Sequence, residues 1–333
     1  MRIGHALAVG LVLAGCGPVR PTPSAPSSAP ASVEQAPASS VGEPGPDAWV
    51  AGAPAPIALT EVAATAHRGE IWVAGGLDAD GHASDRVLVF DPVSQAWSEG
   101  PRVPEPIHHA ALVSDGTGLF LLGGYTGDGF DRPTDVVRML RRPADPWLDH
   151  SRMPEPRAAG GAAWDGQRLV YGGGVGPTGA TATVFVDESG AWTLVGRLSE
   201  AREHLGATSD GAGSTFFLGG RQGGLEGNRA AVDVLTELRV RRRGELPTPR
   251  GGVAAFWWPS LGACLAGGES PTGTNAEVEC IHPSGGTRAL PDLGAPRHGL
   301  GAAVVEGRAY VVLGGPQPGL FVSDAVEVLE LPA

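Results

Sequence analysis

A pair of glycines recurs six times along the chain, each time directly after a short apolar run. The first glycines of successive pairs are 48, 49, 47, 48 and 47 residues apart. A constant period of about fifty residues is typical of propellers in which every blade has four strands. The period therefore predicts six similar blades, marked by Gly75 and Gly76, Gly123 and Gly124, Gly172 and Gly173, Gly219 and Gly220, Gly267 and Gly268, and Gly314 and Gly315.

The composition fits a folded, acidic protein. The 52 glycines and 30 prolines make up about a quarter of the 333 residues, a proportion that can indicate low complexity. Here the glycines keep a fixed period, so we interpret them as turn residues. The formal net charge of -12 argues against a nucleic-acid partner, because proteins that bind nucleic acids present basic surfaces.

The first fifteen residues have the features of a secretion signal. Arg2 precedes an apolar run over residues 6–14, which is too short to span a membrane. The run ends in LAGC, a string that resembles the lipobox of bacterial lipoproteins. The resemblance implies that residues 1–15 are removed and that Cys16 carries three acyl chains, enough for stable anchoring. An ordinary cleaved signal with an incidental cysteine is the alternative.

Residues 16–47 are expected to hold the folded part away from the membrane. After Cys16 the sequence reads GPVRPTPSAPSSAPASVEQAPASSVGEPGP, in which Pro, Ala and Ser dominate without apolar periodicity. Such a composition cannot bury a hydrophobic core. We therefore expect a disordered tether and a lipid-anchored protein of the bacterial cell envelope, at the outer membrane, with the propeller formed by residues 48–333.

Each repeat has the same internal order. A small-residue segment such as RAAGGAAWDG (157–166) precedes the strand that ends in the glycine pair, and an alternating strand such as DRVLVFDP (85–92) follows. Alternation with a period of two indicates strands. A tryptophan then opens the last strand in three repeats, at Trp97, Trp147 and Trp192. This pattern resembles the kelch repeat over residues 48–333, although Val240 and Thr287 replace the tryptophan in repeats four and five.

The sixth repeat lacks its fourth strand, and the missing strand lies at the other end of the propeller sequence. Trp49 precedes Leu59 by ten residues, just as Trp147 precedes Arg157. We therefore expect residues 48–56 to supply the outer strand of blade six. Pairing of the two ends closes the ring and removes the open sheet edge that a linear array would leave.

Two cysteines fall in the fifth repeat. If Gly268 pairs with Ala276 across the second and third strands, Cys264 lies directly opposite Cys280. A disulfide is then expected in an oxidising compartment. A register slip of one residue would instead leave two free thiols on opposite faces of the sheet.

Motifs for catalysis and for metal or cofactor binding are not found in the sequence. A copper site like that of galactose oxidase needs two tyrosines, two histidines and a cysteine crosslink, whereas this chain has only Tyr125, Tyr171 and Tyr310. We interpret the adjacent His108 and His109 as a solvated turn. We therefore expect no catalytic residues, no metal and no cofactor.

The position that opens each repeat suggests a ligand face. It is occupied by Leu59, Ile107, Arg157, Arg202, Arg250 and Arg297, and histidines follow closely at His108, His204 and His298. Kelch propellers commonly take partners on the face that bears these positions and the loops after the glycine pairs. Four guanidiniums near one mouth would suit a carboxylate, a phosphate or an acidic peptide; the alternative is that each arginine bonds neighbouring carbonyls. The loops add the polar residues Asp78, Asp80, Asp128, Asp131, Arg221, Gln222 and Glu269.

Together these features predict a six-bladed kelch-type β-propeller that acts as an extracytoplasmic binding or scaffolding module for a protein or a glycan. The alternative is a carbohydrate-active enzyme, since the pattern is also similar to bacterial sialic-acid mutarotases. Such an enzyme would need a polar axial pocket with an acid or base. The innermost strands are rich in Ala, Gly and Val, so we expect the binding module.

Overall fold

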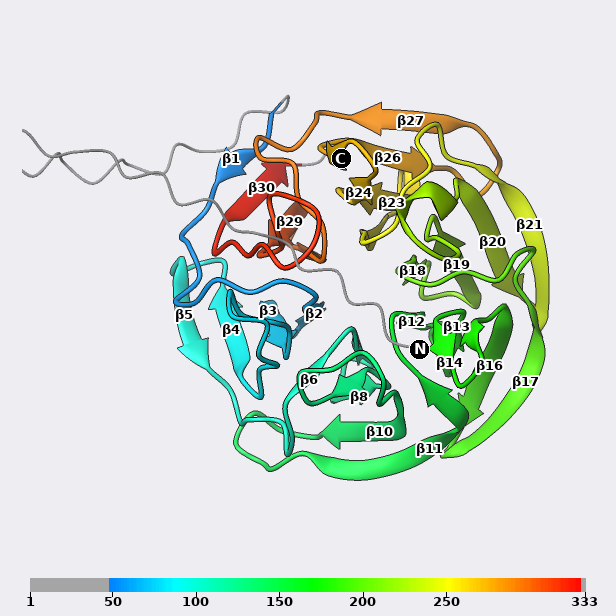
Figure 1. Cartoon of the computed structure of the whole chain (residues 1–333), viewed down its shortest axis with the longest axis horizontal. Coiled ribbons are helices and arrows are strands. Elements are labelled where there is room, and N and C mark those ends of the chain that lie inside the picture. Colours follow the sequence, from blue (N-terminus) through cyan, green and yellow to red (C-terminus); the bar gives the residue numbers. More distant parts are fainter. Residues whose placement is uncertain (1–47, 331–333) are drawn as a thin grey trace, which may run out of the picture. The chain divides into compact units, whose positions relative to one another are not determined.

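The computed structural model describes residues 48–330, so the predicted signal peptide, Cys16 and the tether up to residue 47 lie outside the described residues. The described chain forms six antiparallel sheets of four strands, arranged as blades around a common axis (Figure 1). This is the six-bladed β-propeller that the glycine period predicts. Residues 48–330 include no helix with the length and apolar character that spanning a membrane requires.

The strands of each blade follow one another in the sequence. Blade one consists of β2 (Ala63–His67), β3 (Glu70–Ala74), β4 (Val87–Asp91) and β5 (Ala96–Glu99). Blade two consists of β7 (Ala111–Ser114), β8 (Leu119–Leu122), β10 (Thr134–Leu140) and β11 (Leu148–Arg157). Blade three consists of β12 (Gly161–Trp164), β13 (Leu169–Gly172), β16 (Thr183–Glu188) and β17 (Ala191–Arg197).

The remaining blades repeat this order. Blade four consists of β18 (Gly206–Ser209), β19 (Ser214–Leu218), β20 (Ala231–Thr236) and β21 (Arg239–Glu245). Blade five consists of β22 (Ala254–Trp258), β23 (Gly262–Ala266), β26 (Val278–Ile281) and β27 (Thr287–Leu290). Blade six combines β28 (Gly301–Val305), β29 (Arg308–Val312) and β30 (Val326–Glu330) with β1 (Val50–Ala51).

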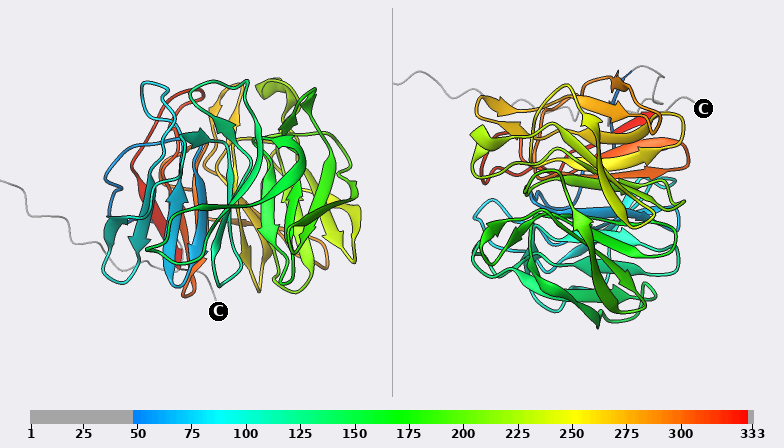
Figure 2. Two further views of the ribbon diagram at one scale, coloured as in Figure 1. Left: turned by 90° about the horizontal axis from the view of Figure 1, so that it is seen from below. Right: turned by 90° about the vertical axis from the view of Figure 1, so that its right-hand side faces the viewer.

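Short strands and one helical turn extend the loops at one end of the ring. They are β6 (Ile107–His108) with β9 (Tyr125–Thr126), β14 (Val175–Gly176) with β15 (Gly179–Ala180), β24 (Glu269–Ser270) with β25 (Gly273–Thr274), and the 3-10 helix η1 (Leu225–Gly227). We call this end of the propeller, which bears the opening positions and the loops after the glycine pairs, the loop face. In the side views the strands of the blades run between this end and the opposite one (Figure 2).

The N-terminal strand closes the ring as predicted. Val50 of β1 lies opposite Val328 of β30 (Figure 1). Gly52 and Ala55 extend this pairing, because their backbone N–H groups donate to the carbonyls of Val326 and Asp324. The two ends of the described residues therefore share one sheet, and β1 covers the edge that β30 would otherwise expose.

The hydrophobic core is divided among the blade interfaces. Six clusters of buried side chains each join two neighbouring blades. Between blades six and one, for example, Phe90 meets Tyr310 with ring centroids 6.1 Å apart. Because burial of apolar surface is the main favourable term in folding, each blade depends on both of its neighbours for stability.

The tryptophans connect the outer strands of adjacent blades. The indole N–H of Trp147 donates to the carbonyl of Pro101 at 2.8 Å, and that of Trp97 donates to the carbonyl of Ala53 at 3.0 Å. Trp192 donates to the hydroxyl of Ser151 in the same way. Thr287 occupies the corresponding place in blade five and is exposed, so this connection is absent there.

The glycine pairs allow the chain to pass close to the next blade. Gly75 and Gly76 both have positive φ, and a Cβ on Gly75 would lie 2.3 Å from the carbonyl oxygen of Ile107. The N–H of Gly76 donates to that same carbonyl at 2.9 Å. Only glycine adopts this conformation without strain while leaving room for the neighbouring backbone.

The equivalent pair is displaced by one residue in two blades, which corrects the predicted pairs there. In blade three the bond to the next blade comes from Gly174, so the structural pair is Gly173 and Gly174, and Gly172 ends β13. In blade six the bond comes from Gly314, and Leu313 takes the first place with a φ of 60°. In blade three a run of three glycines leaves two possible pairs in the sequence. In blade six the first position of the pair is a leucine, so a search for two glycines misses it.

Cys264 and Cys280 lie opposite each other on β23 and β26. Their sulfurs are bonded, and both residues are buried in the core between blades five and six. The crosslink joins two neighbouring strands of one blade.

Candidate functional site

The four arginines at the opening positions do not form an exposed ligand face, which corrects the sequence prediction. Arg157, Arg202, Arg250 and Arg297 are among the most deeply buried large side chains of the described residues. Each guanidinium turns into its own blade and donates to backbone carbonyls or side chains there. Arg250, for instance, donates to the carbonyls of Gly267 and Leu265 at 2.7 and 3.1 Å.

An acid on the third strand neutralises three of these arginines. Arg202 pairs with Asp233 at 2.8 Å, Arg250 pairs with Glu279 at 2.7 Å, and Arg297 pairs with Glu327. In blade three Arg157 instead lies over the ring of Phe185, 5.6 Å from its centroid, and pairs with Glu155. Because these guanidiniums are buried and each is paired with an acid, we interpret them as structural groups that a partner cannot reach.

Six residues at equivalent positions, two beyond each opening position, surround the axis on the loop face. They share a left-handed backbone, with φ between 52° and 69°. We call them the mouth residues: Glu61, His109, Ala159, His204, Gly252 and Gly299. Gly299 must be glycine, because a Cβ there would lie 2.4 Å from the hydroxyl oxygen of Thr60.

Backbone hydrogen bonds join the mouth residues into a ring. The N–H of His109 donates to the carbonyl of Glu61 at 3.1 Å, and the N–H of Ala159 donates to the carbonyl of His109 at 2.8 Å. The series continues from blade to blade, and Val62 closes it by donating to the carbonyl of Gly299 at 3.3 Å. Left-handed backbone at residues other than glycine costs about 1 kcal/mol or more for each residue and is concentrated at functional sites.

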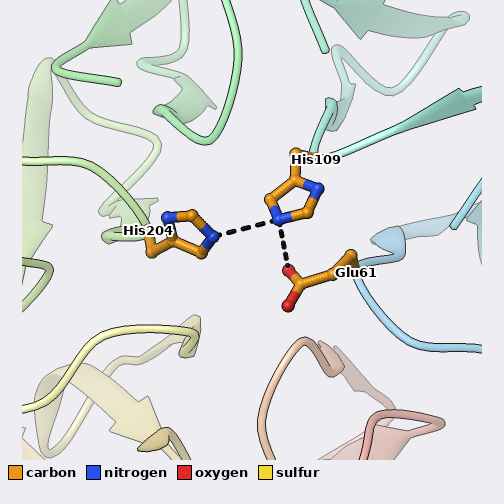
Figure 3. Close-up of side chains that lie close together, drawn as sticks. All are labelled: Glu61, His109 and His204. Carbon is orange, nitrogen blue, oxygen red and sulfur yellow. Dashed lines mark hydrogen bonds and ion pairs between the residues drawn. The ribbon is translucent and has the colours of Figure 1, made fainter. Parts of the chain in front are cut away.

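Three mouth residues bring their side chains together on the axis (Figure 3). Nε2 of His109 lies 3.1 Å from Oε2 of Glu61 and 3.0 Å from Nε2 of His204. The three ligand-type atoms lie within 4.8 Å of one another. The residues come from blades one, two and four, so only the closed ring assembles them.

Further charged groups surround this triad. Nδ1 of His204 contacts the carboxylate of Glu203, and Arg221 pairs with both Glu203 and Glu269. Nδ1 of His298 lies 3.3 Å from Glu61 and 3.8 Å from Glu269.

The pKa values reflect this arrangement. Burial lowers the pKa of His109 and places that of His204 well below its usual range, so both imidazoles are neutral at pH 7. Burial alone would raise the pKa of Glu61, but the charge of His109 when it is protonated and the hydrogen bond from His298 hold it well below its usual range. Burial also opposes the charge on His298, yet its bond to Glu61 raises the pKa of His298.

Two hollows lie along the axis. The first, of about 100 Å³, is lined by mouth residues that include Glu61, His109 and His204. The second, of about 330 Å³, lies between the six innermost strands and is lined mainly by Ala, Gly and Val side chains. The triad thus combines a carboxylate and two neutral imidazoles with space for water or a small ligand.

The sequence interpretation of His108 and His109 as a solvated turn is wrong. Both side chains are buried, and their Nδ1 atoms lie 2.6 Å apart. The role of Glu61 was also missed. The signal was available, because Glu61, His109 and His204 occupy the same position of their repeats, but it appears only when the repeats are aligned on one another.

Comparison with known proteins supports the kelch pattern. Residues 58–104, which contain all of blade one, match the model of the Kelch motif. The chain is similar to Kelch-like protein terF of Aspergillus terreus, with 25% identity over 296 residues that cover 79% of this chain and 62% of the relative.

Other similarities cover less of the chain. Kelch-like protein 41b of Danio rerio is 27% identical over 138 residues, which are 41% of this chain and 22% of the relative. Beta-scruin of Limulus polyphemus is 25% identical over 217 residues, which are 59% of this chain and 23% of the relative. The chain spans less than two thirds of the length of each of these relatives.

Proposed function

We propose that this kelch-repeat propeller binds a partner protein on its loop face while acyl chains on Cys16 hold it in the bacterial cell envelope. Support for the anchor comes from the LAGC string and the Pro-rich segment that follows it. Support for protein binding comes from the kelch resemblance and from apolar side chains on the loop face. The anchor can be tested by radiolabelled palmitate incorporation, which Cys16→Ser should abolish.

The observation behind the docking face is a group of exposed apolar residues on blades two and six, the two neighbours of blade one. Phe130 is 53% exposed in the loop after the glycine pair of blade two, and Leu320 and Phe321 are each 49% exposed in the corresponding loop of blade six. The loop of blade one lies between them, since Leu320 is within 3.3 Å of where a Cβ on Gly81 would lie. Aromatic side chains such as those of Phe130 and Phe321 are enriched in protein interfaces.

Acidic residues surround these anchors and indicate the charge of the partner. Asp80, Asp128 and Asp131 are exposed in the loops of blades one and two. We therefore expect a partner surface that presents apolar side chains beside Lys or Arg.

The docking face can be tested by photo-crosslinking of the full-length chain in isolated envelopes. The test variant changes Phe130, Leu320 and Phe321 to Ser. The control variant changes three apolar residues outside these loops to Ser: Val93, Leu148 and Leu194, which are 80%, 54% and 54% exposed. A protein crosslinked by the wild type and the control but not by the test variant supports the proposal, whereas equal crosslinking by all three contradicts it. A glycan array probed with the same variants would identify a glycan partner instead.

A second candidate function is the carbohydrate-active enzyme. The observation in its favour is the polar axial mouth, where Glu61 offers a carboxylate and His109 and His204 offer imidazoles. Nuclear magnetic resonance of sialic acid anomers can test it. Faster anomer exchange with the wild type than with Glu61→Gln would support the enzyme, and equal rates would count against that substrate.

A further inference from the structure

We propose that Glu61, His109 and His204 form a binding site for a divalent first-row transition metal ion, with Zn²⁺ the expected occupant. This inference goes beyond the proposed protein binding and does not depend on it. It rests on the convergence of three ligand atoms, on the proton positions that their neighbours impose, and on the charge around them.

Two of the three separations between the ligand atoms are close to those around such an ion, and all three atoms lie within 4.8 Å of one another. Adjacent ligands of a tetrahedral zinc ion, at bond lengths near 2.0–2.1 Å, lie about 3.3 Å apart. Nε2 of His109 lies 3.1 Å from Oε2 of Glu61 and 3.0 Å from Nε2 of His204 (Figure 3). Small rotations of these side chains would open the space that an ion needs.

Proton positions around His109 leave Nε2 as a bare acceptor. Nε2 of His108 lies 3.1 Å from the carbonyl of Gly129, which can only accept, so this nitrogen carries the proton. Nδ1 of His108 then accepts the proton of Nδ1 of His109, 2.6 Å away. A neutral His109 with its proton on Nδ1 directs a lone pair from Nε2 toward the carboxylate of Glu61.

His204 is oriented in the same way. Its Nδ1 lies against the carboxylate of Glu203, so a proton on Nδ1 faces an acceptor. The Nε2 lone pair of His204 therefore meets the Nε2 lone pair of His109. Three lone-pair donors facing one another repel, and a metal cation between them would remove that repulsion. Metal-binding histidines are typically held by such a bond from the other ring nitrogen to a carboxylate or carbonyl.

The surrounding charge also favours a cation. Glu61, Glu203 and Glu269 provide three negative charges, while Arg221 and, when protonated, His298 provide two positive charges. The site therefore keeps a net negative charge in either state of His298. Two imidazoles and one carboxylate match a three-ligand zinc site, and the fourth position would open into the hollow lined by the mouth residues.

The test uses the full-length chain, without a histidine tag, purified in detergent and stripped of metal with a chelator. Calorimetric titration with Zn²⁺ should give one site per chain, and Co²⁺ should give the absorption spectrum of a four-coordinate ion. His109→Ala and His204→Ala should each weaken Zn²⁺ binding at least a hundredfold, and Glu203→Gln should weaken it about tenfold or more. The control His82→Ala removes an exposed histidine from the same face and should bind as the wild type does.

Thermal unfolding separates loss of the site from loss of the fold. In chelator the variants should melt close to the wild type, and added Zn²⁺ should raise the Tm of the wild type and of His82→Ala more than that of the variants with weakened binding. Failure of the wild type to bind Zn²⁺ or Co²⁺ would overturn the proposal. Unchanged Zn²⁺ binding by a folded His204→Ala variant would overturn it as well.

Discussion

The guanidinium of Arg202 lies 2.8 Å from the carboxylate of Asp233, and both side chains are buried inside blade four. The same carboxylate oxygen also accepts from the backbone N–H and the hydroxyl of Ser199 at 3.2 and 3.0 Å. The pair therefore joins the opening of the blade to its third strand. Because both side chains are buried, the charge that remains after removal of its partner cannot be hydrated by solvent.

Removal of one charge from this pair should strongly destabilise the propeller. Asp233→Asn leaves Arg202 buried without a counter-ion, and we expect a loss of about 3 kcal/mol or more in the free energy of unfolding. Urea denaturation monitored by tryptophan fluorescence can measure it. Asp135→Asn is the matched control, because its partner Arg152 is largely exposed, and should cost less than about 1 kcal/mol. Equal losses in the two variants would contradict a special role of the buried pair.

An apolar replacement of both partners should be tolerated better than the loss of one. Blade one has Leu59 at the position of Arg202. It has Leu88 at the position of Asp233, because Leu88 lies opposite Val73 just as Asp233 lies opposite Phe217 on the equivalent second strand. The double variant R202L/D233L is therefore expected to be more stable than D233N in the same denaturation experiment, since it leaves no unpaired charge. A double variant less stable than the single one would show that the ion pair also fixes the local geometry.

The fold was largely predictable from the sequence, whereas the site was not. The period of the glycine pairs depends on local turn geometry and fixed the number of blades, and Trp49 revealed the strand that closes the ring. The partners of the arginines lie about thirty residues away on the third strand, and no local pattern marks Asp233 or Glu327 as buried acids. Glu61 and His204 are brought to His109 only by ring closure and curvature, which no spacing rule for short motifs detects.

Trp49 should make a large contribution to ring closure. Its side chain is buried between blades five and six, and its indole N–H donates to the carbonyl of Pro291 at 2.8 Å. Trp49→Ala should cost about 3 kcal/mol or more, the usual range for a buried aromatic side chain. Trp192→Ala provides the comparison, because Trp192 is only partly buried, and should cost less. The closure model would be wrong if the Trp49 variant unfolded at the same urea concentration as the wild type.

His67 should make stability sensitive to acid. Burial and the nearby Arg68 lower its pKa from the usual value of 6.5. The unfolded chain therefore binds a proton at a higher pH than the folded chain, so the contribution of His67 is complete above pH 6.5 and falls as the pH falls through the folded pKa. His67→Asn should flatten the dependence of unfolding free energy on pH between neutral and mildly acidic conditions. A slope unaffected by His67→Asn would refute the assignment.

The bond between Cys264 and Cys280 should stabilise blade five through the unfolded state. The two cysteines are 16 residues apart, and closure of a loop of about fifteen residues is worth about 3 kcal/mol. Since both residues are buried, reductant should act mainly on unfolded molecules and lower the urea midpoint at equilibrium. A variant with both cysteines changed to Ala should show no difference between oxidising and reducing conditions. Intact-mass analysis after alkylation of the unreduced, denatured protein gives a direct check, because modification of Cys264 and Cys280 under those conditions would contradict the bond.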